Sequence, residues 1–350
     1  MSGGKVPLNN IQQGLNIAIV GATGAVGVQM LKMLEGTSLP ISQLKLLASK
    51  RSVGKTYSFK GYPIIVEEVK PDALEGVDIA LFSAGGSLSK ELAPEAARRG
   101  AVVIDNTSAF RMDPDVPLIV PEVNSEALRE HKGIIANPNC STIQMVVALE
   151  PLRQQYGLNR VIVSTYQAVS GAGHTAVQEL KQQTEAILQG EAPKVGKFPH
   201  QIAFNAIPQI DTFQDNRYTF EEMKMINETK KIMGIPELHI AATCVRIPMA
   251  VGHAESVYIE LDQEISVEDA LRVLSNAPGV MVVDNPAQLE YPMPVDAVGK
   301  KDVFVGRVRK DPDEKKGLHL WIVSDNLLKG AAWNSVQIAE ALVQLKMVTI

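Results

Sequence analysis

A cysteine and a histidine in this sequence together suit nucleophilic chemistry on a carbonyl group. Cys140 stands in ANPNCSTIQ, directly before an apolar helical pattern over 141–157. A thiol at a helix N-terminus meets the positive end of the helix dipole and unpaired N–H groups, which lower its pKa and favour the thiolate. His253, at the end of RIPMAVGH, precedes a strand-like segment in a loop position able to face a cleft, and His174 in SGAGH is its rival. Histidine titrates near neutral pH, so either ring can take the thiol proton and return it.

A glycine-rich turn near the N-terminus predicts a dinucleotide site. GATGAVG follows the short apolar run 16–20 and precedes an apolar helical pattern over 28–36. Glycines permit a sharp turn and let backbone N–H groups approach a pyrophosphate at the positive end of the helix. We expect the cofactor to contact Gly21, Thr23, Gly24, Ala25, Val26 and Gly27.

The end of the second predicted strand, 44–49, indicates which nucleotide binds. An NAD enzyme usually places Asp or Glu there to accept a hydrogen bond from the ribose 2′-hydroxyl. This sequence has Ser49, Lys50, Arg51 and Ser52 instead. Cations and hydroxyls attract a 2′-phosphate and no carboxylate repels it, so we expect NADP(H), with a solvated basic loop as the alternative. A nicotinamide cofactor beside a thiolate predicts thioester or thiohemiacetal chemistry with hydride transfer.

The elements that position these residues fall into two parts. Residues 1–138 alternate short apolar strands with helical patterns, which predicts a Rossmann-like, doubly wound parallel sheet. In 139–325 the strand-like runs are separated by long loop-like segments such as 185–220, which predicts an α+β domain with a mostly antiparallel sheet. The C-terminal segment, 326–350, contains the apolar stripe of a long amphipathic helix.

Composition excludes several other classes of protein. The chain has 350 residues, 45% of them hydrophobic, and a net charge of −5 without a dense basic stretch, so it is a globular protein and nucleic acid is not an expected partner. Its two cysteines are too few for a disulfide framework or a thiolate zinc site, and Cys244 in AATCVRIP is interpreted as a small buried residue. Neither a signal peptide nor an apolar run of membrane-spanning length is found, so we expect a cytoplasmic protein with no bound metal.

Several motifs, in order across nearly the whole chain, resemble one family of enzymes. They are GATGAVG, NTSAFRMD, NPNCST, YQAVSGAG, EEMK, CVRIPMAVGH and SDNLLKGAA. Together the sequence resembles the aspartate-semialdehyde dehydrogenases. The resemblance implies an oxidoreductase that uses NADPH to reduce L-4-aspartyl phosphate to L-aspartate 4-semialdehyde with release of phosphate, a step in lysine (diaminopimelate), threonine and methionine biosynthesis. It also implies a homodimer or homotetramer, and a C-terminal helix that packs back on the nucleotide domain.

The resemblance assigns a reaction role to three residues. Cys140 matches the nucleophile that displaces phosphate and forms an acyl-thioester. His253 matches the acid/base residue, and Gln167 matches the residue that orients the intermediate.

It also assigns substrate and cofactor contacts. Arg246 matches the arginine that binds the substrate α-carboxylate, a task suited to a planar fork with two parallel donors. Glu221 would pair with the substrate ammonium, although the adjacent Glu222 is an alternative. The matching phosphate-site cations are Arg111 and Lys224, and the matching positions that line the nicotinamide are Ser170, Gly171 and Asn326.

Two other functions stay open at this point. The sister enzyme N-acetyl-γ-glutamyl-phosphate reductase has the same architecture, but its cysteine motif typically reads NPGC, and here Asn139 replaces the glycine. Arg246 with Glu221 also suits a free amino acid rather than an acylated one. A non-catalytic NADPH-binding paralogue is the second alternative, and the retained Cys140, Gln167 and His253 argue against it.

Overall fold

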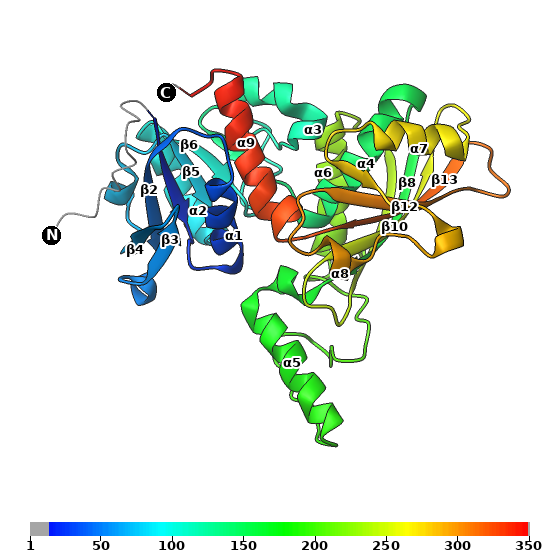
Figure 1. Ribbon diagram of the computed structural model, residues 1–350, viewed down its shortest axis with the longest axis horizontal. Helices are drawn as coiled ribbons and strands as arrows, with labels where there is room; N and C mark the ends of the chain where they lie inside the picture. The colour runs from blue at the N-terminus through cyan, green and yellow to red at the C-terminus, as the bar shows by residue number, and fades with distance from the viewer. Residues whose placement is uncertain (1–13, 349–350) are drawn as a thin grey trace. The chain divides into compact units, whose positions relative to one another are not determined.

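The computed structural model describes residues 14–348, so the polar leader and the last two residues lie outside the described residues. The chain divides into two compact units. Unit 1 combines the residues up to Pro138 with those from Ala331 onward, and unit 2 is Asn139–Gly330 (Figure 1). The C-terminal segment therefore shares a unit with the N-terminal half of the chain.

Unit 1 is built on a twisted, mainly parallel sheet with strand order β3-β4-β2-β1-β5-β6-β7. Only the β3–β4 pair is antiparallel among the described pairings of this sheet. The strands are β1 (Leu15–Val20), β2 (Ile41–Ala48), β3 (Thr56–Phe59), β4 (Tyr62–Glu68), β5 (Ile79–Phe82), β6 (Val102–Asp105) and β7 (Ile134–Ala136). Central strands such as β1 and β5 are apolar and buried on both faces, as a parallel sheet covered on two sides requires. The predicted Rossmann-like class is confirmed.

Helices cover both faces of this sheet. α1 (Ala25–Glu35) and α9 (Trp333–Gln344) pack side by side on one face, and α2 (Gly86–Arg98) covers the other (Figure 1). In α9, Val336 and Leu342 are completely buried in the core shared with α1. A short helix, α3 (Pro121–Asn124), also contacts α9.

The C-terminal helix is shorter than the 326–350 expected from its apolar stripe. α9 begins at Trp333, and the residues before it, Leu328–Ala332, form a π-helical turn. The delayed start has a local cause, because the Asp325 carboxylate accepts the N–H of Leu327 and holds a turn there. The apolar run 117–120 forms only an isolated bridge, between Leu118 and Ala136, since Pro117 and Pro121 interrupt strand pairing.

Unit 2 contains a second sheet with strand order β11-β12-β13-β10-β8-β9. Its central pairings, β12–β13, β13–β10 and β10–β8, are antiparallel, and the outermost pairings are parallel. The strands are β8 (Arg160–Gln167), β9 (His239–Arg246), β10 (His253–Glu260), β11 (Val280–Val282), β12 (Val303–Lys310) and β13 (Gly317–Ser324). The predicted mostly antiparallel sheet is confirmed, although β11, β12 and β13 were not expected from the sequence.

One face of this second sheet is covered by helices. α4 (Cys140–Tyr156), α6 (Phe220–Met233) and α7 (Val267–Ser275) lie across it (Figure 1). A further helix, α5 (His174–Leu188), forms a small apolar cluster with the chain around 198–207, and α8 (Pro294–Ala297) contacts β13. None of the helices in the described part of the chain is both long and apolar enough to cross a bilayer.

Candidate active site

The nucleophile candidate Cys140 is the first residue of α4, one residue earlier than the predicted helix start. Asn139 caps this helix, and its side-chain oxygen accepts the backbone N–H groups of Ser141 (3.0 Å) and Thr142 (3.2 Å). The thiol is partly exposed, whereas Asn139 is buried. The cap fixes Cys140 at the positive end of a 17-residue helix, the position in which a thiolate is stabilised.

Asn139 also connects the nucleophile to α6. Its side-chain amide donates to Glu221 Oε1 at 2.8 Å, and its backbone N–H donates to Glu228 Oε2 at 2.6 Å. Sequence reasoning assigned no role to Asn139 or Glu228. The signal for Asn139 was present, because asparagine directly before a helical pattern is a preferred N-cap residue. Nothing in the local sequence marks Glu228, since its contact bridges 89 positions of the chain.

Strand register brings the other candidates into one row across the sheet. Arg246 on β9 pairs with Gln167 on β8, and His253 on β10 pairs with Ser324 on β13. Gln167 and His253 are themselves neighbours, because the adjacent pair along the two strands is Tyr166 with Ala254. Side chains in one such row point to the same face. All four are buried, on the face that the helices cover.

Hydrogen bonds fix the orientation of Gln167 within this row. Its amide nitrogen donates to Glu221 Oε1 at 3.1 Å and lies 3.5 Å from His253 Nε2. Its amide oxygen accepts the hydroxyl of Thr165 at 3.0 Å. The Gln167 side chain therefore links the carboxylate of α6 to the imidazole of β10.

Glu221, rather than Glu222, belongs to this cluster. Burial alone would raise the pKa of Glu221, but Lys224, hydrogen bonds from Asn139 and Gln167, and the charge of Arg246 lower it to about 2. Lys224 Nζ lies 3.3 Å from Glu221 Oε2 and 2.9 Å from Asp211 Oδ2.

Glu222 does a different, structural task. It completes a capping box with Thr219 at the start of α6 and accepts the backbone N–H of Cys244 at 3.0 Å. Cys244 is fully buried, as predicted, and burial raises the pKa of its thiol.

Arg246 is a buried guanidinium with spare donors. Its Nη1 donates to the carbonyl of Ala168 at 2.7 Å, its only side-chain hydrogen bond within the described residues. Burial lowers the pKa of Arg246 and the nearby Glu221 carboxylate raises it in part, yet a guanidinium stays charged in proteins. The remaining N–H groups can bind a planar anion such as a carboxylate.

His253 differs from the expectation of a loop residue. It is the first residue of β10 and is completely buried, because strand pairing with β13 already begins there. Its Nδ1 accepts the backbone N–H of Ala168 at 3.0 Å, so the neutral ring carries its proton on Nε2. Burial and the charge of Arg246 lower the pKa of His253 to about 3. The ring is therefore a neutral N–H donor near pH 7.

Because His253 is buried as a neutral ring, we expect the native state to lose stability in acid. Between about pH 6.5 and 3 the unfolded chain protonates His253 and the native state does not, so stability falls as the pH falls, by up to about 1.4 kcal/mol per pH unit. Denaturant titrations from pH 4.5 to 7 should show that His253→Gln flattens this slope by about one proton. His174→Gln is the control, because His174 is exposed at the start of α5, and it should keep the wild-type slope. A slope unchanged in His253→Gln would contradict a neutral buried ring.

Gly171 keeps the space beside Arg246 and His253 open. A Cβ built at this position would lie 3.0 Å from Arg246 Nη1 and 3.4 Å from His253 Nε2. Its backbone lies outside the left-handed region, so alanine fits the local conformation and only the methyl group is the problem.

We expect Gly171→Ala to lower kcat/KM about tenfold with little change in thermal stability, because displacing catalytic groups by fractions of an ångström is costly. Steady-state kinetics and a thermal melt check this. Gly86→Ala is the matched control, since an added Cβ there meets nothing within 4 Å. Equal kinetics for both variants would show that Gly171 does not shape the site.

Asn326, just before the π-helical turn, forms hydrogen bonds with two other segments of the candidate site. Asn326 accepts the backbone N–H of Gly252, the neighbour of His253, at 2.9 Å, and its amide nitrogen donates to Ser170 Oγ at 2.9 Å. Within the π-helical turn, Gly330 packs on Cys140, because a Cβ there would lie only 2.7 Å from Cys140 Cβ. Ser170 and Asn326 are thus brought together, and Asn326 supports the chain beside His253.

Arg111 belongs to unit 1. It is buried, and its guanidinium donates to the carbonyls of Asn137 (2.9 Å) and Asn106 (3.1 Å). These contacts hold the 106–113 loop to the end of β7.

The glycine loop of unit 1 has the shape that a dinucleotide needs. A Cβ on Gly21 would lie 2.6 Å from the carbonyl oxygen of Ser83, and one on Gly27 would lie 2.2 Å from that of Gly21. The first i→i−4 bond of α1 runs from Val28 to Gly24, which leaves the preceding N–H groups without intrahelical partners. Thr23 contacts Ser52 at 3.2 Å, which connects this loop to the Ser49–Ser52 turn, where Arg51 is exposed. These residues therefore fit a phosphate-containing cofactor.

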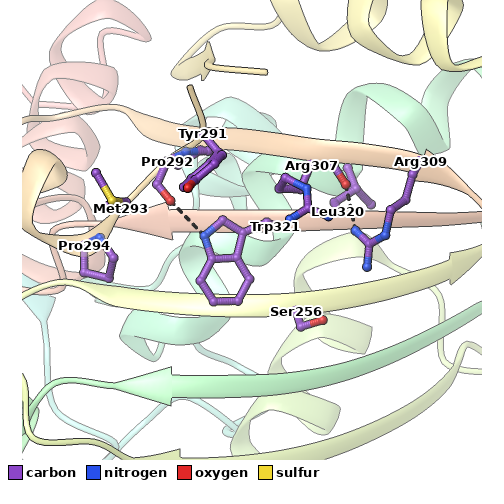
Figure 2. Close-up of a pocket in the computed structure, with 9 residues that line it drawn as sticks. All are labelled: Ser256, Tyr291, Pro292, Met293, Pro294, Arg307, Arg309, Leu320 and Trp321. Atoms are coloured by element: carbon purple, nitrogen blue, oxygen red, sulfur yellow. Dashed lines mark hydrogen bonds between the residues drawn. The ribbon is translucent and has the colours of Figure 1, made fainter. Parts of the chain in front are cut away.

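A separate hollow of about 310 Å³ lies on unit 2 and contains none of the predicted site residues. Figure 2 shows Trp321 at its centre, with the indole N–H donating to the Pro292 carbonyl at 2.9 Å. Ser256 and Arg309 line it from the strands. Because side chains alternate along a strand, Ser256 and Trp321 point to the face opposite the row of Arg246, Gln167, His253 and Ser324, and this hollow therefore lies on the side of the sheet away from α4.

Comparison with known proteins identifies the family. A family profile described as "Semialdehyde dehydrogenase, NAD binding domain" matches residues 16–131, and one described as "Semialdehyde dehydrogenase, dimerisation domain" matches 149–329. An aspartate-semialdehyde dehydrogenase of Bacillus subtilis is 66% identical over 344 residues, covering 96% of this chain and 99% of that protein. The chain belongs to the aspartate-semialdehyde dehydrogenase family. A second member of the family, from Aquifex aeolicus, is 58% identical over 335 residues, with 95% and 98% of the chains covered.

Solved structures of this family have the same fold. Aspartate-semialdehyde dehydrogenase II of Vibrio cholerae, crystallised with ASA, superposes with a TM-score of 0.93 at 51% identity, over 95% of this chain and 99% of that one. The Candida albicans enzyme, crystallised with NADP, has a TM-score of 0.72 at 25% identity, over 95% and 99%. The chain is thus an oxidoreductase-family protein with a nicotinamide-cofactor domain.

Proposed function

We propose that this protein catalyses the NADPH-dependent reduction of L-4-aspartyl phosphate to L-aspartate 4-semialdehyde, with release of phosphate. The observation that carries the proposal is the buried row of Arg246, Gln167 and His253 in the same unit as a capped Cys140. Relatives that bear the aspartate-semialdehyde dehydrogenase name at 66% and 58% identity support it. The product belongs to lysine, threonine and methionine biosynthesis, which we place in the cytoplasm.

Cys140 is the proposed nucleophile. As the thiolate, its sulfur attacks the acyl carbon, the carbon–oxygen bond to phosphate breaks, and an acyl-thioester remains on the enzyme. When bound, NADPH would supply a hydride to that carbon. The resulting thiohemiacetal collapses to the aldehyde and frees the sulfur.

His253 and Gln167 are the proposed polar partners of the reacting group. Because Nδ1 of His253 is occupied by the Ala168 N–H, its Nε2 holds the proton and donates to the developing oxyanion. Nε2 is therefore proposed to act as the acid in the acid/base role expected for His253. Gln167, fixed by Thr165 and Glu221, orients the same intermediate.

The charged residues are proposed to bind the substrate. Arg246 binds the α-carboxylate through its spare donors and Glu221 faces the ammonium group. Lys224 and Arg111 are the proposed phosphate-site cations; Arg111 donates to backbone carbonyls, and Lys224 pairs with Glu221 and Asp211.

The cofactor is proposed to be NADP(H). Its pyrophosphate would be held by the Gly21–Gly27 loop, with Ser49, Arg51 and Ser52 at the 2′-phosphate and Ser170, Gly171 and Asn326 near the nicotinamide. The exposed, carboxylate-free turn after β2 supports NADP over NAD.

Cofactor choice gives a direct prediction. Arg51→Ala should raise the KM for NADPH about tenfold or more, because a hydrogen bond to a charged group contributes about 1.5–3 kcal/mol, while the KM for NADH stays unchanged. Lys55→Ala, which removes an exposed cation three residues beyond the turn, should change neither value. Equal losses for both cofactors would contradict the 2′-phosphate assignment.

The assembly is proposed to be a homodimer, or a tetramer built from dimers, through unit 2. The matched "dimerisation domain" profile supports this. The face of the sheet opposite the catalytic row also supports it, because apolar side chains lie there. The ring centroids of Tyr166 and Trp321 are 5.4 Å apart, and Ile162 is 44% exposed.

The test runs the reaction in reverse with L-aspartate semialdehyde, varied phosphate and NADP, following NADPH absorbance. Phosphate-dependent NADPH formation is expected. Turnover only with N-acetylglutamate semialdehyde would assign the protein to the N-acetyl-γ-glutamyl-phosphate reductases. No turnover with either substrate would favour a non-catalytic protein.

A further inference from the structure

Glu255 is a buried carboxyl group to which the proposed reaction gives no role. It lies on β10 two residues after His253, so both side chains point to the catalytic face of the sheet. The residue is completely buried. Neither carboxyl oxygen has a hydrogen-bond partner among residues 14–348.

The neighbours of Glu255 are the residues that support the catalytic row. Across the sheet it pairs with Thr165, whose hydroxyl orients the Gln167 amide, and on the other side with Ile322. From α4 it is faced by Gln144, one helical turn beyond Cys140. Glu255 therefore forms the layer directly behind the catalytic residues.

Gln144 extends this layer to the strand beside His253. Its amide oxygen accepts the hydroxyl of Ser324 at 2.6 Å, and Ser324 pairs with His253. The Gln144 amide nitrogen approaches the Glu255 carboxyl without reaching hydrogen-bond geometry within the described chain.

The charges around this layer do not compensate a carboxylate. Cys244 of β9 lies within electrostatic range of Glu255 as well as of Glu221 and Glu222 of α6. The guanidinium of Arg246 interacts with Glu221, and the neighbours of Glu255 on α4 and β8, Gln144 and Thr165, are uncharged. A buried carboxylate without a cation or donors is very costly. Consistent with this, burial raises the pKa of Glu255 well above its ordinary value, and Gln144 offsets this only in part.

We propose that Glu255 is held as an uncharged carboxylic acid and acts as a positioning residue for Gln167 and His253. The neutral acid fills the buried space between Thr165 and Gln144 and places no charge behind the residues that orient Gln167 and His253. A negative charge at this point would instead favour protonation of His253 and attract Arg246 away from Glu221. The activity arm of the test rests on the function proposed above, whereas its spectroscopic arms do not.

The charge state is tested by infrared difference spectroscopy on the intact protein at pH 8. Subtracting the Glu255→Gln spectrum from the wild-type spectrum should reveal the carbonyl stretch of a protonated carboxyl. Glu260→Gln is the control, because Glu260 is partly exposed beside Arg160 and should contribute a carboxylate band. A carboxylate band for Glu255 would overturn the proposal.

The positioning role is tested by comparing Glu255→Gln with Glu255→Leu. Glutamine keeps the polar, neutral shape, so we expect kcat within about threefold of wild type and an unchanged pH profile of kcat. Leucine is branched and removes the polar group beside the buried Gln144 amide, so we expect Thr165 and Gln144 to shift and kcat to fall at least tenfold with the NADPH KM unchanged. Equal activity of the leucine variant and wild type, or equal losses in both variants, would contradict positioning.

A measurement that does not depend on activity separates a failure of the positioning role from a failure of the proposed function. The imidazole ¹⁵N chemical shifts of His253 should be the same in wild type and Glu255→Gln and should move in Glu255→Leu. Unmoved shifts in the leucine variant would contradict the positioning role. The shifts can be recorded even if the protein turns over neither semialdehyde.

Discussion

Replacing Cys140 with serine should lower kcat by at least about 10³-fold, because a hydroxyl at this position is not appreciably ionised at neutral pH and is a far weaker nucleophile. Binding of NADPH should stay within about twofold of wild type, since the glycine loop that would hold the pyrophosphate lies in unit 1. Stopped-flow absorbance measures the first effect and cofactor fluorescence titration the second.

Cys244→Ala is the matched control for this experiment. Cys244 is buried on β9 and burial raises the pKa of its thiol, so its removal should cost some stability but leave kcat within a few-fold of wild type. Retained turnover in Cys140→Ser, or a comparable loss in Cys244→Ala, would rule out the assignment of the nucleophile.

Arg246→Lys is expected to lower kcat/KM for aspartate semialdehyde by a factor of about 30–150, equivalent to about 2–3 kcal/mol. Lysine keeps the positive charge but cannot present two parallel N–H donors to a carboxylate. The loss arises at a buried site, where an imperfectly paired anion is costly. Steady-state kinetics in the reverse direction measure it.

The control for Arg246 is an arginine on the neighbouring strand. Arg160 on β8 is 47% exposed in its side chain and lies 3.7 Å from Glu260, so Arg160→Lys should leave kcat/KM unchanged. If Arg246→Lys behaved like Arg160→Lys, then Arg246 would be a structural partner of Glu221 and Ala168 rather than a substrate ligand.

Sequence patterns predicted the fold class because the strong signals were local. An apolar run followed by GATGAVG and a helical stripe predicts a strand, turn and helix, and the structure has β1 and α1 there. The helix that begins at Cys140 was found for the same reason. Strands β12 and β13 form a local antiparallel hairpin, but they were missed because the regular alternation of β12 is interrupted by a register shift between Gly306 and Arg309, where Arg307 has a positive φ.

The candidate site could be predicted in residue types but not in geometry. Cys140, Gln167, Arg246 and His253 were all named, yet their alignment depends on the register between strands that are distant in the chain. The same limit explains why the prediction for His253 was wrong. The glycine directly before it suggested a loop, although pairing with β13 begins at His253.

Strand alternation in unit 2 has a consequence for how this gene can change. Gln167, His253 and Arg246 each have a chain neighbour on the opposite face of the sheet: Tyr166, Ala254 and Val245. Deleting or inserting one codon within such a strand would exchange the two faces and place residues of the opposite face in the proposed reaction site. Length variation among descendants of this sequence should therefore accumulate in connections such as 189–200 and avoid the strands of this sheet.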